Sequence, residues 1–345
     1  MKTRLITLIA MVGLICLSVV GRATAAGDLY IYTWGEYTPP ELVEKFEKKY
    51  DIDVRIDTYD SNETMLAKLK AGATGYDIIV PGDYMIAILI KEGLIAKVNP
   101  NQMSNYKNVD PKWRDVYWDP GRQYSVPWAW GTTSFVVDTD KISGDPNTLK
   151  HLFDPQSAAK GKINMLRDVN DVINAGLRYL DLPRCNSNPN DLKKLLALLE
   201  KQKDWVKSYN SETKELLVSG EAVVSMSWNG YAMRARDEKS SLVYAYPVEG
   251  YTGWMDNLAV PKTASNIDNA KLFMNFMMEP EHAAMVSNYA RYSNGIMGSA
   301  NFMDKELAAA PEVTLPAHAP SPEFVPPCDP DVVKAYDRLW TKLLR

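Results

Sequence analysis

Strand-like and helix-like segments alternate along the chain, and this alternation most restricts the folds open to it. Apolar, β-prone runs at 29–32, 54–58 and 76–80 are each followed by a helical pattern. Strands that are separated by helices pair in parallel, with the helices packed on the faces of the sheet. The pattern returns between residues 162 and 289. The sequence therefore predicts an α/β protein with two mainly parallel sheets.

The length of the chain indicates two structural units. At about 100–200 residues per domain, 345 residues correspond to two domains. The segments 124–138 and 253–261 have strand-like composition, and we expect them to cross between two lobes, with flexing near 134–137 and 256–259. The predicted boundaries give an N-terminal lobe of 27–133 with 258–300 and a C-terminal lobe of 134–257 with 301–345.

Two helix starts carry recognisable capping residues. Thr38 precedes two prolines and an acidic residue, so we expect it to be the N-cap of the first helix. Asp60 and Glu63 have the spacing of a capping box at the start of the second helix. Gly72 is expected to stop that helix.

The N-terminus has the pattern of a cleavable secretory signal. Lys2 and Arg4 precede an apolar stretch at 5–20, and the small residues before position 26 give a cleavage site after Ala25. The apolar stretch is short for a membrane span, so a retained anchor is the weaker alternative. We therefore expect a signal peptide at 1–25 and an exported mature protein.

Export changes what the cysteines imply. Removal of the signal peptide removes Cys16 and leaves Cys185 and Cys328. Two cysteines in an oxidising compartment form a possible disulfide. Spacing alone does not show whether the two residues approach each other, so both the bridged and the free forms stay open.

Acidic and aromatic residues follow most of the predicted strands. In open α/β sheets, ligands bind outside the carboxyl ends of the strands. Carboxylates accept charge-assisted hydrogen bonds from ammonium groups, and aromatic faces attract cations by about 0.5–2 kcal/mol per contact. The pattern thus suits a flexible ligand with two or more ammonium groups. The residues at these ends are Trp34, Glu36, Tyr37, Asp83, Tyr84, Asp168, Asp171, Trp228, Trp254 and Asp256.

Each of these residues also has a structural explanation when it is taken alone. A tryptophan at a strand end more often belongs to the core, Asp168 has the position of a helix cap, and Glu36 fits a solvated loop. Their joint occurrence at several strand ends favours the ligand site.

Several function classes lack support in the sequence. The net charge is −4 and no Lys/Arg cluster forms a stripe, so we expect no nucleic-acid partner. We find no G-x-S-x-G, H-E-x-x-H, P-loop or C-x-x-C motif, and the three histidines lack metal-ligand spacing. We expect neither a metal nor a cofactor. Asp168 and Asp171 leave an acid–base enzyme, such as a glycosidase, open as an alternative.

Longer motifs carry a family resemblance over nearly the whole mature chain. Together they resemble the periplasmic polyamine-binding proteins, which are the spermidine/putrescine-binding components of bacterial ABC importers. The resemblance implies a type II two-lobe fold, in which each lobe is a mainly parallel sheet flanked by helices and two hinge crossings join the lobes. The motifs are L-Y-I-Y-T-W-G-E-Y-T-P-P (29–40), Y-D-S-N-E-T (59–64), Y-D-I-I-V-P (76–81), S-W-N-G (227–230) and W-M-D-N-L-A-V-P (254–261).

The resemblance also implies a set of ligand-binding residues. Gly82 and Asp83 stand where the family usually has a serine after the proline, so a small polar contact is lost and an acid is gained. The family's late glutamine has no match near 324–329. Glu36 and the W-M-D motif are closer to spermidine-preferring members. The matching residues are Trp34, Glu36, Tyr37, Tyr84, Asp168, Asp171, Trp228, Trp254, Asp256 and Tyr292.

The function implied by the resemblance is transport rather than catalysis. A monomeric periplasmic protein would capture spermidine or putrescine and deliver it to an ABC permease in the inner membrane. The alternative is a periplasmic sensor that presents its ligand-bound, closed form to a membrane signalling protein. Both functions require the same lobe closure, so the sequence does not separate them.

Overall fold

The computed structural model describes residues 27–72 and 75–345. The predicted signal peptide and Cys16 lie outside the described residues. The strands are β1 (Gly27–Trp34), β2 (Ile52–Tyr59), β3 (Ile78–Ile79), β4 (Ser125–Asp138), β5 (Ile163–Met165), β6 (Val206–Tyr209), β7 (Val224–Trp228), β8 (Leu242–Tyr244), β9 (Thr252–Ala259) and β10 (Glu323–Phe324).

The helices follow the strands along most of the chain. Short 3-10 turns lie at Pro100–Gln102, Ser104–Asn108, Pro111–Trp113, Ser157–Ala159 and Ser299–Asn301. The α-helices are α1 (Pro40–Tyr50), α2 (Asn62–Lys70), α3 (Asp83–Lys91), α4 (Lys150–Phe153), α5 (Val169–Tyr179), α6 (Pro189–Gln202), α7 (Thr213–Val218), α8 (Asn229–Glu238), α9 (Ile267–Met277), α10 (Pro280–Ala290), α11 (Lys305–Ala309) and α12 (Pro330–Leu343). Within the described residues, no helix is long and apolar enough to cross a membrane.

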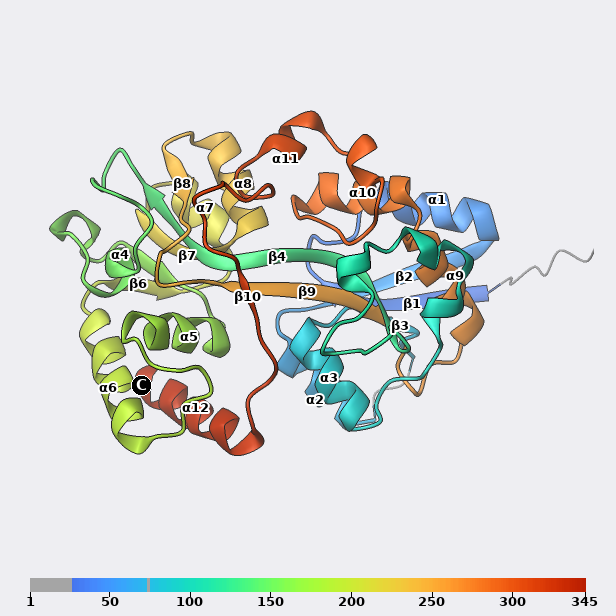
Figure 1. Ribbon diagram of the computed structural model, residues 1–345, viewed down its shortest axis with the longest axis horizontal. Coiled ribbons are helices and arrows are strands. Elements are labelled where there is room, and N and C mark those ends of the chain that lie inside the picture. The colour runs from blue at the N-terminus through green and yellow to red at the C-terminus, as the bar shows by residue number, and fades with distance from the viewer. Residues whose placement is uncertain (1–26, 73–74) are drawn as a thin grey trace, which may run out of the picture.

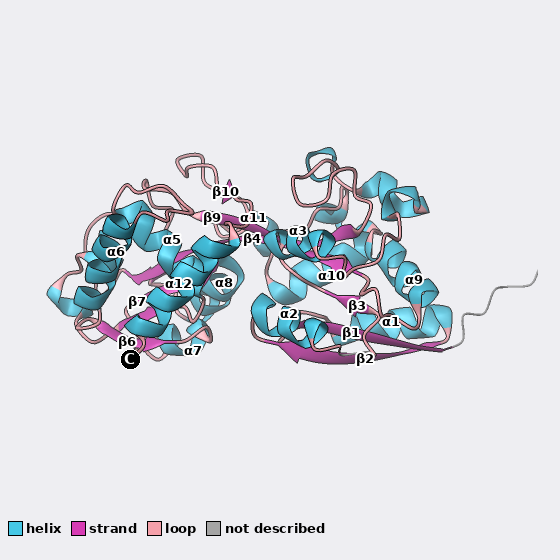
Figure 2. Cartoon of the chain, turned by 90° about the horizontal axis from the view of Figure 1, so that it is seen from below, coloured by secondary structure: helices cyan, strands magenta, loops and turns pink. Residues whose placement is uncertain are grey.

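The strands form one sheet with two parallel halves. Its order is β2-β1-β3-β9-β4-β7-β5-β6, with β10 paired to β9 and β8 paired to β4. The strands β1, β2 and β3 are parallel, as are β5, β6 and β7, whereas β4 and β9 are antiparallel to each other. Figures 1 and 2 show that β4 and β9 join two groups of strands and helices. The predicted α/β fold with two crossings is confirmed.

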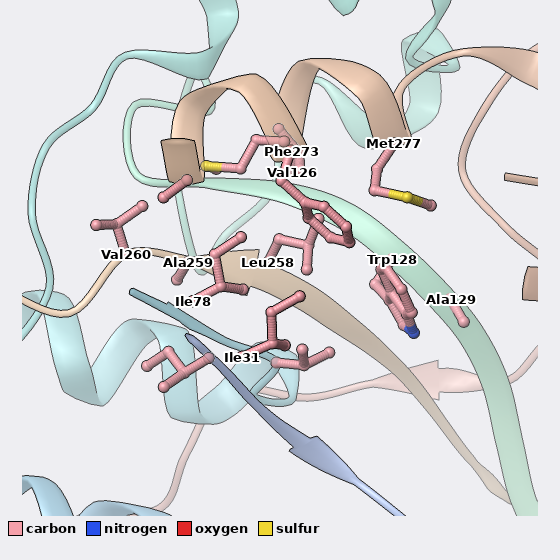
Figure 3. Close-up of a cluster of buried hydrophobic side chains, with 14 of the residues drawn as sticks. Ile31, Ile78, Val126, Trp128, Ala129, Leu258, Ala259, Val260, Phe273 and Met277 are labelled. Atoms are coloured by element: carbon pink, nitrogen blue, oxygen red, sulfur yellow. The ribbon is translucent and has the colours of Figure 1, made fainter. Parts of the chain in front are cut away.

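The two largest of the four hydrophobic clusters in the described residues lie on either side of the crossing strands. One core combines β1–β3, α1–α3, α9 and α10 with the nearer parts of β4 and β9, and the other combines β5–β7, α4–α6 and α12 with the far part of β4. Figure 3 shows how Ile31, Ile78, Val126, Leu258 and Phe273 meet in the first core. The exact lobe boundaries stay a prediction.

The register of β4 against β9 places the crossing. Gly131 pairs with Trp254 and Thr132 pairs with Gly253. The segments predicted to flex lie to either side: 134–137 pairs with β7, and 256–259 pairs with the opposite end of β4. The crossing therefore centres on the two glycines and their partners.

Both predicted helix caps are wrong in detail. The N-cap of α1 is Pro39, one residue after Thr38, and it makes no side-chain capping bond. The N-cap of α2 is Ser61, whose hydroxyl accepts a 3.1 Å hydrogen bond from the amide of Thr64. The short serine side chain reaches this amide directly, and Glu63 is left free for another partner. The helix stop near Gly72 agrees with the end of α2 at Lys70.

The two cysteines of the described chain are bonded. Cys185 and Cys328 form a disulfide with a Cα–Cα distance of 5.2 Å. The bond ties the segment that contains β10 to the loop between α5 and α6. This segment pairs with β9 at Thr252 and Gly253, so it covers the crossing from one side.

Candidate functional site

A cavity of about 660 Å³ lies between the two groups of strands and helices. Its wall draws on segments after β1, β2, β3, β5, β7 and on β9 itself, as expected for a site at the carboxyl ends of strands. All the residues predicted for the site line this one cavity: Trp34, Glu36, Tyr37, Asp83, Tyr84, Asp168, Asp171, Trp228, Trp254, Asp256 and Tyr292. Their binding role stays a prediction.

Asp256 lies on the crossing strand β9 and is a buried carboxylate with one side-chain donor. It is 8% exposed, and Oδ2 accepts a 2.7 Å hydrogen bond from the hydroxyl of Tyr37. Burial raises the pKa of Asp256 to about 8, the hydrogen bond from Tyr37 lowers it, and the charge of Asp83 raises it. A buried carboxylate with one neutral donor favours the approach of a cation.

Aromatic side chains line the same cavity as this carboxylate. The rings of Tyr292 and Trp254 meet edge to face with centroids 5.1 Å apart, and Tyr292 meets Tyr37 at 5.9 Å. The indole nitrogen of Trp34 donates a 2.9 Å hydrogen bond to the carbonyl of Val80, which fixes the ring at the end of β1. Such ring faces attract cations and also cover methylene groups.

Asp83 begins α3 and is almost fully buried, at 3% exposed. Burial raises its pKa to about 7, while hydrogen bonds from the amide of Tyr84 and the hydroxyl of Tyr117 lower it. The Tyr117 hydroxyl lies 3.3 Å from Asp83 but only 2.6 Å from the carbonyl of Val325. Because a phenol has one proton, the shorter bond to Val325 competes for it and weakens the bond to Asp83.

Asp168 and Asp171 lie at the N-terminus of α5. Asp168 is the N-cap, and its Oδ1 accepts a 2.9 Å hydrogen bond from the amide of Asp171. Asp171 accepts bonds of 3.3 Å from the indole of Trp228 and the hydroxyl of Thr133. Burial raises the pKa of both acids, and the charge of Asp171 raises that of Asp168 further. Capping and cavity lining are therefore combined in Asp168.

Glu36 has a different environment. It has a positive φ of 49° in the turn after β1, and its side chain is 71% exposed. Its carboxylate lies 3.2 Å from the guanidinium of Arg234, which belongs to α8 on the other side of the cavity. Glu36 thus carries an ion pair across the cavity mouth in addition to its predicted role.

Sequence reasoning missed five charged residues of the cavity wall, namely Asp60, Glu63, Arg184, Glu212 and Arg234. The strand-end rule would have found Glu63, because it follows the end of β2 by a few residues. The two arginines come from a loop and a helix of the second group of elements, and the pattern of strand ends does not indicate them.

Residues 41–315 match the sequence model of the bacterial extracellular solute-binding proteins. The chain belongs to this family. A spermidine/putrescine-binding periplasmic protein of Salmonella typhimurium is 35% identical over 292 residues, which are 83% of each chain. A putrescine-binding periplasmic protein of Pseudomonas aeruginosa is 31% identical over 94% of this chain and 95% of its own.

A solved structure also matches nearly the whole chain. A putative spermidine/putrescine ABC transporter from Listeria monocytogenes is 30% identical with a TM-score of 0.86, over 92% of this chain and 98% of its own. These matches confirm the predicted family, the two-lobe fold and the periplasmic location. They also confirm that the protein is a solute-binding protein rather than an enzyme.

Proposed function

We propose that this protein captures a polyamine, spermidine or putrescine, between its lobes and delivers it to an ABC-type importer of the inner membrane. The observation that supports this proposal most strongly is the environment of Asp256. Its buried carboxylate has one neutral hydrogen-bond donor and lies in a cavity lined by aromatic residues. An ammonium group would supply the missing positive charge and additional donors. The names of the Salmonella and Pseudomonas relatives support the same ligand class.

The cavity wall matches both parts of a polyamine. Carboxylates at Asp83, Asp168, Asp171 and Asp256 suit its ammonium groups, and the half-buried tryptophans suit its methylene chain. An acidic cavity disfavours ligands with a carboxylate, because like charges repel one another. The eleven predicted site residues are therefore assigned to ligand binding.

Delivery requires that the ligand changes the shape presented to the permease. We assign the lobes to 27–133 with 258–300 and to 134–257 with 301–345, and the crossing to β4 and β9. A cation between carboxylates of both lobes would favour the closed form by its differential affinity. The closed monomer would then dock on the permease.

Calorimetric titration tests this function. The mature protein is titrated with putrescine, spermidine, spermine, agmatine and γ-aminobutyrate. We expect the polyamines to bind with a Kd of about 1 μM or lower, which is about −8 kcal/mol, and γ-aminobutyrate not to compete. Equal binding of γ-aminobutyrate or of a neutral sugar would contradict the proposal.

A further inference from the structure

Residues 323–328, which we call the strap, contact both the crossing and the cavity. The strap begins with β10, which pairs with the first two residues of β9. Its residues Val325, Pro327 and Cys328 line the cavity. Figure 1 shows this segment in red, where it passes the crossing and continues to α12. The strap therefore forms part of the cavity wall next to the strands that join the lobes.

The strap is fixed to the C-terminal lobe as assigned above. Cys328 forms the disulfide with Cys185. Nη1 of Arg184 donates a hydrogen bond to the carbonyl of Pro326. Arg184 and Cys185 both lie between α5 and α6. Because one of these two attachments is covalent, the end of the strap moves with the C-terminal lobe.

Tyr117 contacts the strap from the N-terminal lobe. Its hydroxyl donates a 2.6 Å hydrogen bond to the carbonyl of Val325. Its ring meets that of Trp118 edge to face, with the centroids 4.9 Å apart, and Trp118 is buried. The tyrosine is therefore anchored in its own lobe. The adjacent carbonyls of Val325 and Pro326 thus accept hydrogen bonds from opposite lobes.

Phe324 adds an apolar contact between the strap and the N-terminal lobe. Its ring meets that of the buried Trp113 edge to face, with the centroids 5.3 Å apart. Aromatic pairs in this geometry are favourable beyond the area that they bury. A Cβ added at Gly253 would lie 2.7 Å from the ring of Phe324, so this ring also packs directly on the backbone of β9. One polar and one aromatic contact therefore hold the strap on this side.

The polar contact depends closely on the distance between the lobes. O–H···O hydrogen bonds have lengths of about 2.5–3.0 Å, so a separation of Tyr117 from Val325 by about 1 Å breaks this bond. The same hydroxyl lies 3.3 Å from Oδ2 of Asp83, which lines the cavity. Movement of the strap therefore also changes the hydrogen bonding of an acid in the cavity wall.

We infer that Tyr117 is a positioning residue for the cavity: its hydroxyl holds the strap on the N-terminal lobe, while the Cys185–Cys328 bond holds the strap on the C-terminal lobe. The inference rests on the proposed function, in which the ligand leaves after the lobes separate. Because the disulfide keeps the strap with the C-terminal lobe, separation must break the bond between Tyr117 and Val325. The contact therefore slows the release of a bound polyamine.

Stopped-flow tryptophan fluorescence on the mature protein tests this role. The dependence of the observed rate on spermidine concentration gives the association rate constant as its slope and the dissociation rate constant as its intercept. We expect Tyr117→Phe to raise the dissociation rate constant about fivefold, the effect of one hydrogen bond, and to leave the association rate constant within about twofold. Tyr289→Phe removes a hydroxyl from an exposed tyrosine of α10, outside the cavity wall that the described residues form, and should match the wild type.

The disulfide separates this role from a local effect of the tyrosine. Without the disulfide the strap is free to follow either lobe, so the Cys185→Ser, Cys328→Ser protein should release spermidine faster. Adding Tyr117→Phe to that protein should raise the dissociation rate constant by less than about twofold more, whereas independent contributions would multiply. If the double-serine protein does not fold, Phe324→Leu replaces it, because loss of the aromatic contact with Trp113 also loosens the strap.

Hydrogen exchange of the empty protein tests the contact without a ligand. The amide of Glu323 donates a 3.1 Å hydrogen bond to the carbonyl of Tyr251, and its exchange should be faster in Tyr117→Phe but not in Tyr289→Phe. An unchanged dissociation rate constant in Tyr117→Phe, or an equal increase with and without the disulfide, overturns the inference. If the wild type binds no polyamine, the proposed function fails, and an unchanged exchange of Glu323 then overturns the role of Tyr117 separately.

Discussion

The hydroxyl of Tyr37 donates a 2.7 Å hydrogen bond to Asp256, although 219 positions separate these residues in the chain. Tyr37 follows the end of β1, and Asp256 lies on the crossing strand β9. Burial and the charge of Asp256 raise the pKa of Tyr37 well above its usual value, so the phenol stays a donor. One neutral hydrogen bond does not replace the lost hydration of a carboxylate. The carboxyl of Asp256 therefore keeps its proton up to about pH 8 in the empty cavity, and an ammonium group of a ligand would compensate the charge that forms when this proton leaves.

The first prediction concerns Asp256→Asn. This change keeps the shape of the side chain and removes the charge, so spermidine affinity should fall by about a hundredfold or more, as expected when one partner of a buried charge pair is lost. The melting temperature of the empty protein should not fall, because burial of the charge opposes folding. Calorimetry and thermal unfolding on the same variant measure both quantities.

Glu36→Gln is the matched comparison for Asp256→Asn. Its carboxylate is exposed and already paired with Arg234, so we expect an affinity loss below about tenfold. A stable Asp256→Asn protein that binds spermidine like the wild type would remove Asp256 from the site. A lower melting temperature with normal affinity would assign it to the local fold instead.

The second prediction is that ligand binding releases protons near neutral pH. The pKa of Asp256 is raised to about 8 and that of Asp83 to about 7 in the empty cavity. An ammonium binds the ionised form, so affinity should rise from pH 6 to pH 8 and level off above. The ligand stays charged in this window, because its pKa is near the lysine value of about 10.4. Calorimetry in buffers of different ionisation enthalpy measures the released protons.

The stability of the empty protein should change in the opposite direction. The usual pKa of an aspartate is 3.8, so the folded protein holds the Asp256 proton between about pH 4 and pH 8 while the unfolded chain does not. The free energy of unfolding therefore falls as pH rises through this range. In the Asp256→Asn variant, the free energy of unfolding should decrease less over this pH range. Ligand binding without proton release would contradict the predicted rise of affinity with pH. An equal pH dependence of the free energy of unfolding in the wild type and in Asp256→Asn would contradict the predicted change in stability.

Much of the site follows from local sequence patterns. The runs before Trp34, Asp83 and Trp228 have strand composition, and the carboxyl ends of parallel strands meet at one edge of a sheet. This rule places residues from distant segments in one cavity without knowledge of any contact. The apolar run at 76–80 likewise predicts a buried strand, and Ile78 and Ile79 are fully buried.

Other features depend on contacts between segments that no local pattern describes. Glu63 has capping-box spacing, but its carboxylate accepts a hydrogen bond from the hydroxyl of Tyr84, 21 positions away. The side chain of Ser61 caps the helix instead. Arg234 reaches Glu36 from a helix 198 positions later. The register of β4 against β9 is also set by tertiary packing, and it pairs Gly131 with Trp254 and Thr132 with Gly253.

The third prediction is that spermidine makes the protein more compact. Glu63 on α2 and Asp168 at the N-terminus of α5 line the same cavity, and the negative charge of Asp168 raises the pKa of Glu63, so a cation bound between these elements would draw them together. Saturating ligand should therefore reduce the radius of gyration measured by solution X-ray scattering. Asp256→Asn at the same ligand concentration should keep the larger radius. An unchanged wild-type radius at saturation would exclude closure about β4 and β9.

The fourth prediction concerns the Cys185–Cys328 bond. It joins residues 143 positions apart, and in the chain-entropy model a loop of this size contributes about 5 kcal/mol to the free energy of unfolding. The double Cys185→Ser, Cys328→Ser variant should therefore melt well below the wild type, and reductant should lower the wild-type value but not that of the variant. Equal melting temperatures with and without reductant would contradict this role.

The last prediction uses Gly131 at the crossing. A Cβ added there would lie 2.3 Å from Oδ1 of Asn229 and 2.7 Å from the ring of Trp254. Both neighbours must move, and Trp254 is part of the cavity wall. Gly131→Ala should therefore weaken spermidine by about tenfold or more as well as lower the melting temperature. Calorimetry on the variant at a temperature below its unfolding transition measures the affinity.

Gly295→Ala separates a cavity effect from a general loss of stability. A Cβ added at Gly295 would lie 2.7 Å from Cβ of Pro127. This clash also forces a neighbour to move, but Pro127, unlike Trp254, does not line the cavity. We expect this variant to melt at a lower temperature and to bind spermidine within about twofold of the wild type. If both alanine variants lose affinity in proportion to their loss of stability, the effect of Gly131→Ala is not local. If Gly131→Ala binds normally, the position of the Trp254 ring does not control recognition, and the aromatic wall serves the fold alone.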